Sequence, residues 1–186
     1  MLPMKKITLI SMILSLILSL GIAFAAPTTL YVDPSSVTGL TPGQTFTINI
    51  KVSDVTNLYG FEFKLGYDTS ILDATEITIG PFLNEPIYTF KKKIDNTNGF
   101  LWVATSSQKP AAPKSGSGTL ATITFQVTGS GSCALDLYGT KLGNSDVNPI
   151  PHVVNDGYYG SVSLGIMDSV LQFFRNIFGR FLLVMR

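Results

Sequence analysis

Strict alternation of apolar and polar residues is the feature of this sequence that most limits its possible folds. Residues 46–52, 61–67 and 121–127 each carry an apolar side chain at every second position. Side chains of a β-strand point alternately to the two faces of a sheet, so this period places one apolar face toward a core. No long helical period competes with it between residues 28 and 162. The alternation predicts antiparallel sheets with one buried and one solvated face.

Shorter strands are expected between these three segments. Weaker apolar stretches fall at residues 30–33, 76–79, 88–94, 100–105, 134–137 and 158–162. Residues that favour turns (Gly, Pro, Asn and Asp) separate the stretches. About nine short strands joined in this way predict an all-β domain, a sandwich or barrel of two antiparallel sheets. Residues 107–118, rich in Pro, Ala, Ser and Gly, are expected to form a long flexible connector.

Composition removes several classes of function. The 13 Lys and Arg against 12 Asp and Glu leave a formal charge of +1, without the basic surplus by which a protein holds nucleic-acid phosphates. One Cys and one His exclude a disulfide scaffold and a Cys/His zinc cluster, and leave little material for a nucleophile beside a base. We therefore expect a protein that is not an enzyme, uses no cofactor or metal and binds no nucleic acid.

The N-terminus has the pattern of an export segment. Lys5 and Lys6 precede an apolar run over residues 7–24, and Ala23-Phe24-Ala25 gives a small-x-small cleavage pattern. These are the parts of a secretory signal peptide, so residues 1–25 are predicted to be a signal helix on a secreted or surface-attached protein. The apolar run is close to the length that spans a bilayer, which makes an uncleaved signal anchor the alternative.

The C-terminal residues 166–186 differ from the body of the chain in charge and in period. They carry three Arg against one Asp, whereas residues 26–165 carry eight Lys against eleven Asp and Glu. Their apolar residues recur with a helical period and predict an amphipathic helix. Arg opposite Phe and Leu is typical of a helix on a membrane surface, and packing on its own domain or a second copy explains the pattern equally well. The residues expected to make this membrane or oligomer contact are Val170, Phe174, Ile177, Phe178, Phe181 and Leu182.

Four segments resemble, in the right order, the cohesin domain family. They lie at residues 33–53, 58–72, 116–127 and 155–162, and contain Asp33-Pro34 with Thr41-Pro42-Gly43, Gly60-Phe61-Glu62-Phe63, Thr119-Leu120-Ala121-Thr122, and Asn155-Asp156-Gly157. The likeness covers nearly all of residues 28–163. It implies a nine-stranded jelly-roll sandwich over residues 26–165. It also implies a non-catalytic extracellular role: holding a dockerin, a small calcium-loaded helical module, or, through kinship with carbohydrate-binding modules, a polysaccharide.

Candidate binding residues follow from the expected strands, because contacts in this family lie on an exposed sheet face. If residues 61–67 turn their aromatic and leucine side chains inward, Glu62 and Lys64 face solvent. The strand at 100–104 is apolar on both faces, so a loop, the tail or a partner must cover one of them. The candidates for partner binding are Glu62, Lys64, Lys91, Lys93 and Trp102. Ordinary structural roles explain the same residues: lysines that protect a sheet edge, and a tryptophan in the core.

Two functions from different classes are consistent with these features. The first is a secreted, cohesin-like module that binds a protein or a glycan through its sheet face. The second is a structural subunit of a cell-envelope assembly that uses the C-terminal helix for oligomer or membrane contact. Deletion of the tail separates them, because only the second function requires it.

Overall fold

The computed structural model describes residues 26–160, and within them every regular element is a β-strand. The ten strands are β1 Thr29–Asp33, β2 Ser36–Thr38, β3 Thr45–Gly66, β4 Leu72–Ile79, β5 Ile87–Asp95, β6 Phe100–Ser107, β7 Lys114–Val127, β8 Ser132–Asn144, β9 Val153–Asn155 and β10 Gly157–Gly160. The all-β expectation is confirmed, with ten strands in place of about nine. The predicted signal helix and the predicted tail helix lie outside the described residues. Within residues 26–160, the structure contains no helix able to span a membrane.

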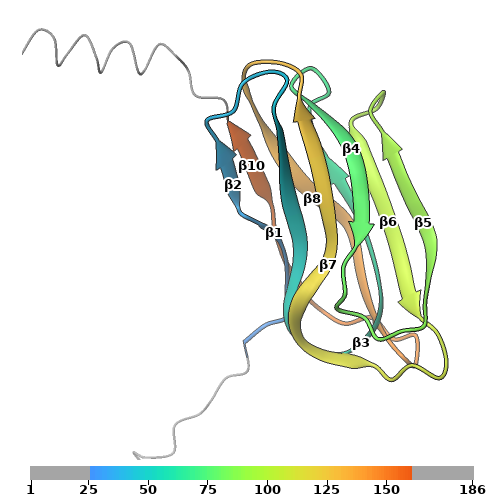
Figure 1. Cartoon of the computed structure of the whole chain (residues 1–186). Coiled ribbons are helices and arrows are strands. Elements are labelled where there is room, and N and C mark those ends of the chain that lie inside the picture. The colour runs from blue at the N-terminus through green and yellow to red at the C-terminus, as the bar shows by residue number, and fades with distance from the viewer. Residues whose placement is uncertain (1–25, 161–186) are drawn as a thin grey trace, which may run out of the picture.

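The strands form two sheets that share β3 (Figure 1). Sheet I has the order β5-β6-β3-β8-β10-β2, and sheet II has the order β9-β1-β3-β7-β4. The first part of β3 pairs with β1 and β7, and its last part, residues 58–66, pairs with β6 and β8. Figure 1 shows β5 and β6 at one side of the sandwich and β2 and β10 at the other.

The middle of β3 explains why the sequence suggests two strands where the structure has one. The pairing with β7 shifts between Val52 and Leu58, and Asp54 and Asn57 take positive φ values of 54° and 57°. Such shifts bend a strand and increase its twist. The bend lets one continuous strand leave sheet II and enter sheet I, so the two alternating segments at 46–52 and 61–67 belong to one element.

The prediction of a long flexible connector over residues 107–118 is wrong for the second half of that segment. Residues 114–118 are the start of β7 and pair with the bend of β3. The hydroxyls of Ser115 and Ser117 accept hydrogen bonds from the backbone N–H groups of Asn57 and Asp54, at 2.9 and 3.1 Å. The serines therefore accept hydrogen bonds from backbone N–H groups that the irregular strand pairing leaves without a partner. Their abundance in this segment predicted a flexible loop, whereas they stabilise an irregular part of the sheet.

The core lies between the two sheets and follows the predicted alternation. Phe61, Phe63 and Leu65 of β3 are 5%, 0% and 0% exposed, while the residues between them are half-buried. Phe125 of β7 is fully buried and stacks on Phe46 at a centroid distance of 5.5 Å. Burial of each such side chain stabilises the fold by about 1.5–3 kcal/mol.

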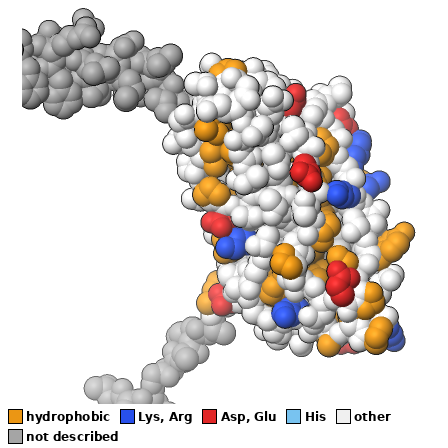
Figure 2. Space-filling view, viewed as in Figure 1, with side chains coloured by type: hydrophobic (Ala, Val, Ile, Leu, Met, Phe, Trp, Pro, Cys, Tyr) orange, Lys and Arg blue, Asp and Glu red, His pale blue; other side chains and the backbone are white. Residues whose placement is uncertain are grey.

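The outer face of sheet II is rich in threonine, and we call it the threonine face. It includes Thr47 and Asn49 of β3, Thr122 and Thr124 of β7, and Thr75 and Thr78 of β4, together with the carboxylates of Glu76 and Asp73, which the register places opposite Thr124 and Gln126. Cross-strand pairing joins these residues in rows, and Thr122 Oγ1 donates a hydrogen bond to Asn49 Oδ1 at 2.7 Å. Figure 2 shows the molecule from this side, with acidic and basic side chains scattered over the neutral surface and several lysines toward the β5 side.

Candidate partner-binding face

The outer face of sheet I brings together all five residues that the sequence proposes for partner binding. Glu62 and Lys64 lie on β3, Trp102 lies on β6, and Lys91 and Lys93 lie on β5. The register pairs Lys64 and Lys93 with Trp102 from its two sides. Their neighbours along β3 and β6 point into the core, so these five side chains point outward. We call this surface, together with Tyr138 and Lys141 of β8, the lysine face.

A row of alternating rings and ammonium groups crosses the lysine face. The Lys64 Nζ lies 4.7 Å from the centroid of the Trp102 ring, and the Lys91 Nζ lies 4.8 Å from the same centroid. Lys64 Nζ also lies 5.8 Å from the centroid of Tyr138. Cation–π contacts of this kind contribute about 0.5–1 kcal/mol each at exposed sites. Trp102 is therefore a half-buried surface residue and not part of the core.

Glu62 fixes the tryptophan ring from one end. Trp102 Nε1 donates a hydrogen bond to Glu62 Oε1 at 3.0 Å, and Lys141 Nζ makes an ion pair with Glu62 Oε2 at 2.9 Å. Both carboxylate oxygens of Glu62 thus have a partner on the face itself. The arrangement holds the ring in one orientation and leaves Glu62 neutralised by Lys141.

The lysines of β5 divide between the two sides of the strand. Lys93 lies 2.8 Å from Asp95 and 5.3 Å from the centroid of the Phe100 ring. The hydrogen bond from Lys93, followed by those from Asn98, lowers the pKa of Asp95 from its ordinary 3.8 to about 2. Lys92 pairs with the buried Val103 and faces the gap between β5 and β4. Since β5 is the edge strand of sheet I, Lys92 protects that edge while Lys91 and Lys93 belong to the face.

Two ammonium groups of this face have no compensating carboxylate. The ion pairs among residues 26–160 are Lys51–Asp33, Lys93–Asp95 and Lys141–Glu62. Lys64 and Lys91 are absent from these pairs. Asp136, on the same side of β8 as Tyr138, makes no ion pair either. The centre of the lysine face is therefore positively charged around Trp102.

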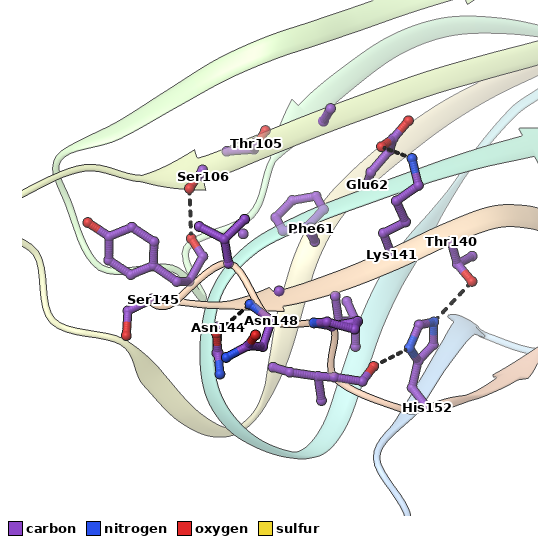
Figure 3. A pocket seen from close by; sticks show the side chains of 18 of the residues that line it. Phe61, Glu62, Thr105, Ser106, Thr140, Lys141, Asn144, Ser145, Asn148 and His152 are labelled. Atoms are coloured by element: carbon purple, nitrogen blue, oxygen red, sulfur yellow. Dashed lines mark hydrogen bonds and ion pairs between the residues drawn. The ribbon is translucent and has the colours of Figure 1, made fainter.

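A hollow of about 540 Å³ opens beside this centre (Figure 3). It lies among residues 59–62 of β3, 104–106 of β6, 140–144 of β8 and the loop that follows β8. Gly60 leaves space there, because a Cβ at this position would come within 3.1 Å of the Ser106 Oγ. Phe90 of β5 lines the hollow, is 65% exposed and meets Tyr88 edge to face at 4.8 Å. The hollow offers an apolar side chain a place to bind.

The polar groups around the hollow hold its shape. Asn144 Oδ1 accepts hydrogen bonds from the backbone N–H groups of Asp146 and Asn148, at 3.0 and 2.9 Å, and fixes the loop after β8. His152 contacts the Ile150 carbonyl through Nδ1 and the Thr140 hydroxyl through Nε2 (Figure 3). Among the described residues, every buried side-chain nitrogen and oxygen has a hydrogen-bond partner, and no group of His, Cys, Asp and Glu is arranged to hold a metal ion.

Tyr138, Lys141 and the hollow are the parts of this face that the sequence did not indicate. Gly139, with a φ of 60°, shifts the register between β8 and β3, so that Lys141 comes opposite Glu62 and Tyr138 opposite Lys64. A bulge cannot be placed from alternation alone, although a glycine inside a strand signals that one is possible. The hollow depends on a loop fold that the sequence pattern does not specify.

A β-sandwich whose one outer face is charged, aromatic and hollowed has the features of a binding module. Comparison with known proteins gives the family. The sequence profile of the cohesin domain matches residues 30–158, and a search of curated proteins finds no match. This chain belongs to the cohesin domain family, whose members are non-catalytic binding modules.

Solved structures support the same fold. A non-cellulosomal cohesin from the hyperthermophilic archaeon Archaeoglobus fulgidus has a TM-score of 0.60 and 20% identity, over 77% of this chain and 97% of its own. The sixth cohesin of Acetivibrio cellulolyticus scaffoldin B, solved with a dockerin, has a TM-score of 0.60 and 20% identity, over 73% and 99%. A Clostridium thermocellum cohesin from a type I cohesin–dockerin complex has a TM-score of 0.60 and 17% identity, over 76% and 99%. At these identities the likeness shows the fold.

Proposed function

We propose that this chain is a secreted or surface-attached cohesin module that holds a dockerin-type protein module through its lysine face. Cohesins of the same fold have been solved in complexes with dockerins, and the chain itself belongs to their family. The export pattern of residues 1–25 supports an extracellular location. Membership of the cohesin family supports a dockerin-type partner, and the arrangement of side chains on the lysine face supports that face as the binding surface.

The observation that carries this proposal is the contrast between the two outer faces of the sandwich. On the threonine face, Thr122 donates a hydrogen bond to Asn49 and Thr75 donates one to the Thr124 carbonyl. The lysine face holds a half-buried tryptophan, two ammonium groups without a carboxylate and an apolar hollow. Tryptophan, tyrosine and neighbouring pockets are the features that dominate binding energy at protein interfaces.

A division of roles follows from the positions of the residues. Trp102, at the centre of the lysine face, is the expected anchor, with its ring fixed by Glu62. The hollow beside it takes an apolar side chain of the partner, and the exposed Tyr88 and Phe90 border that contact. Lys141, 73% exposed, lies at the rim and affects the rate of association more than the affinity.

Polysaccharide binding has less support from this geometry. Sugar rings stack on flat, open aromatic surfaces, whereas Lys64 and Lys91 each place an ammonium group within 5 Å of the Trp102 ring centroid. The exposed pair Tyr88 and Phe90 meets at an interplanar angle of 75°, so the two rings form no common platform. The glycan alternative is kept as an outcome of the test.

The test is calcium-dependent capture by the full chain. The immobilised chain is exposed to extracellular proteins of its source with calcium present, and bound proteins are released with a chelator, because the dockerin fold depends on calcium. We expect released proteins with paired Asp-rich loops, and their loss on Trp102→Ala but not on the matched threonine-face variant Thr124→Ala. Capture that Trp102→Ala leaves unchanged contradicts the proposed face. Retention of the chain on insoluble polysaccharide with no protein captured supports the glycan alternative.

The second part of the proposal concerns how the C-terminal tail attaches the module to its surroundings. We propose that residues 166–186 hold the module near a membrane or in an assembly through the apolar face that includes Phe174, Phe178 and Phe181. Liposome flotation of the full chain, compared with a chain ending at residue 165, measures the membrane contact. Flotation that does not depend on the tail contradicts it. Loss of dockerin capture together with loss of oligomers on the same deletion favours the structural-subunit alternative.

A further inference from the structure

We propose that the partner of the lysine face presents an acidic polypeptide surface, and that one of its carboxylates binds between Lys64 and Lys91 above Trp102. This inference rests on the proposed function, since it names the chemistry of the partner at the same face. The inference goes beyond the proposed function, because membership of the family does not specify the charge of the partner surface. The evidence for it is the balance of charges around the Trp102 ring.

The two ammonium groups are held near each other by contacts that do not neutralise them. Each lies within 5 Å of the Trp102 centroid, so the distance between them is below about 10 Å, the Debye length at about 0.1 M salt. Lys64 is further placed by Tyr138 on its other side. Two positive charges at this separation repel each other, and an anion that contacts both lowers the energy of both at once.

The carboxylates already on the face do not supply that anion. Glu62 uses Oε1 for the Trp102 indole and Oε2 for Lys141. Asp95 is paired with Lys93, and its remaining oxygen accepts bonds from Asn98. Asp136 forms no ion pair with any lysine of the described chain. The positive surplus at Lys64 and Lys91 is therefore available to a partner.

The neighbouring hollow favours a polypeptide over an acidic glycan as the source of the carboxylate. Lys91 is paired in the register with Ala104, which lines the hollow, so the charged site and the apolar site adjoin. A protein surface supplies acidic and apolar side chains together, whereas an acidic polysaccharide offers carboxylates with hydroxyls. An acidic polypeptide with an exposed apolar residue matches both parts of the lysine face.

The chain offers a direct readout, since Trp102 is its only tryptophan. The full chain is titrated with poly-L-glutamate at low salt while the tryptophan emission is recorded, with poly-L-lysine as the opposite-charge control. We expect a saturable change in emission with poly-L-glutamate that weakens as salt is added, and no saturable change with poly-L-lysine. The arginines of the tail can bind the same probe, so lysine variants are needed to assign the emission change to the lysine face.

Variants connect that signal to the two lysines. Lys64→Gln with Lys91→Gln is expected to weaken poly-L-glutamate binding roughly tenfold, as the loss of two exposed charge contacts predicts. Lys51→Gln with Lys109→Gln removes the same net charge elsewhere and is expected to leave the signal unchanged. Equal losses in the two double variants, or no emission change at all, overturn the inference. Tighter binding of polygalacturonate than of poly-L-glutamate also overturns it, in favour of an acidic glycan.

Failure of this inference is distinguishable from failure of the proposed function. If calcium-dependent capture depends on Trp102 while poly-L-glutamate gives no response, the face binds a dockerin-type partner by other contacts and the acidic inference is wrong. If poly-L-glutamate binds through Lys64 and Lys91 while capture is unaffected by Trp102→Ala, the acidic site stands and the dockerin proposal is wrong.

Discussion

The two outer faces of this sandwich cover the same core and both include part of β3, yet they differ in charge and in aromatic content. On the threonine face, Thr122 donates a hydrogen bond to Asn49 across the strands, and the neighbouring Lys51 forms an ion pair with Asp33 at 3.2 Å. On the lysine face, Lys64 and Lys91 lie against a tryptophan and form no ion pair with a carboxylate of the described residues. The comparison teaches that positive charge, aromatic rings and a hollow gather on one face only, and this is why we propose that face as the one that binds a partner.

β3 makes the comparison unusually direct. Its first part places Thr47 and Asn49 on the threonine face, and its last part places Glu62 and Lys64 on the lysine face. Both parts alternate in the same way, so backbone geometry does not distinguish the faces. β-branched threonine suits a pleated, half-buried surface, while lysine and aromatic residues are those found at interfaces and protected edges. Within β3, the difference therefore lies in residue type.

Charge reversal at the centre of the lysine face is expected to give the largest effect. Lys64→Glu with Lys91→Glu places two negative charges beside Trp102, where an acidic partner is then repelled. We expect affinity for the captured dockerin-type partner to fall by roughly 100-fold or more, equivalent to about 2.7 kcal/mol. Titration calorimetry measures it, with Lys51→Glu and Lys109→Glu as the matched reversal elsewhere. An affinity that rises in the lysine-face variant means that the partner surface is basic.

Filling the hollow is expected to give the next largest effect. Ala104→Leu adds bulk at the floor of the hollow on the outer surface of β6, where it displaces a partner side chain without disturbing the core. We expect affinity to fall roughly tenfold, the size of one lost apolar contact. Thr124→Leu makes the same kind of change on the threonine face and should leave affinity unaltered. Unchanged binding by Ala104→Leu excludes the hollow from the interface.

The ion pairs of the two faces are expected to respond at opposite ends of the pH scale. The pKa of Asp95 is lowered to about 2 by its bond from Lys93, so its stabilising effect is present above its ordinary 3.8 and is lost as pH falls toward 2. The pKa of Lys51 is raised from 10.5 by its hydrogen bond to Asp33, so that effect is present below 10.5 and is lost as pH rises through the raised value. Melting temperatures across pH measure both.

Single variants show which residue causes the change in stability at each end of the pH range. Asp95→Asn should flatten the acid side of the profile between about 4 and 2 and leave the alkaline side unchanged. Lys51→Gln should do the reverse. If the melting temperature of Asp95→Asn still falls at low pH, other carboxylates cause the loss of stability. Asp68 is the next candidate, because hydrogen bonds from Ser70 lower its pKa.

The alternation of the sequence was sufficient to predict the sandwich and the outward direction of two of the candidate residues. It predicted Glu62 and Lys64 outside because Phe61, Phe63 and Leu65 form a consistent apolar set. It did not predict β2 and β9, which are three residues long and pair in parallel with residues distant in the chain. Such pairing is set by tertiary contacts and leaves no local pattern.

Two local irregularities limited the prediction of the site. The bulge between Thr89 and Lys91 decides which β5 lysines share a side with Trp102, and the register shift at Gly139 brings Lys141 to Glu62. Each shift of one residue moves a side chain to the other face, so alternation alone leaves these contacts open. The half-buried position of Trp102 follows from the same strand registers. Residue type alone does not contain this information, and it therefore favoured a position in the core.

The smallest expected effect tests the threonine face itself. Thr122→Val keeps the shape and the β-branch but removes the hydroxyl that donates to Asn49 at 2.7 Å. We expect the free energy of unfolding in urea to fall by about 1 kcal/mol, since Asn49 is half-buried and loses its donor, and partner affinity to stay unchanged. Thr47→Val, on the same face, is the matched control and should change neither quantity, because the Thr47 hydroxyl has no hydrogen-bond partner among residues 26–160. If Thr122→Val weakens capture while Thr47→Val does not, the paired row takes part in binding, and the proposed division between a threonine face without a partner and a lysine face that binds one no longer holds.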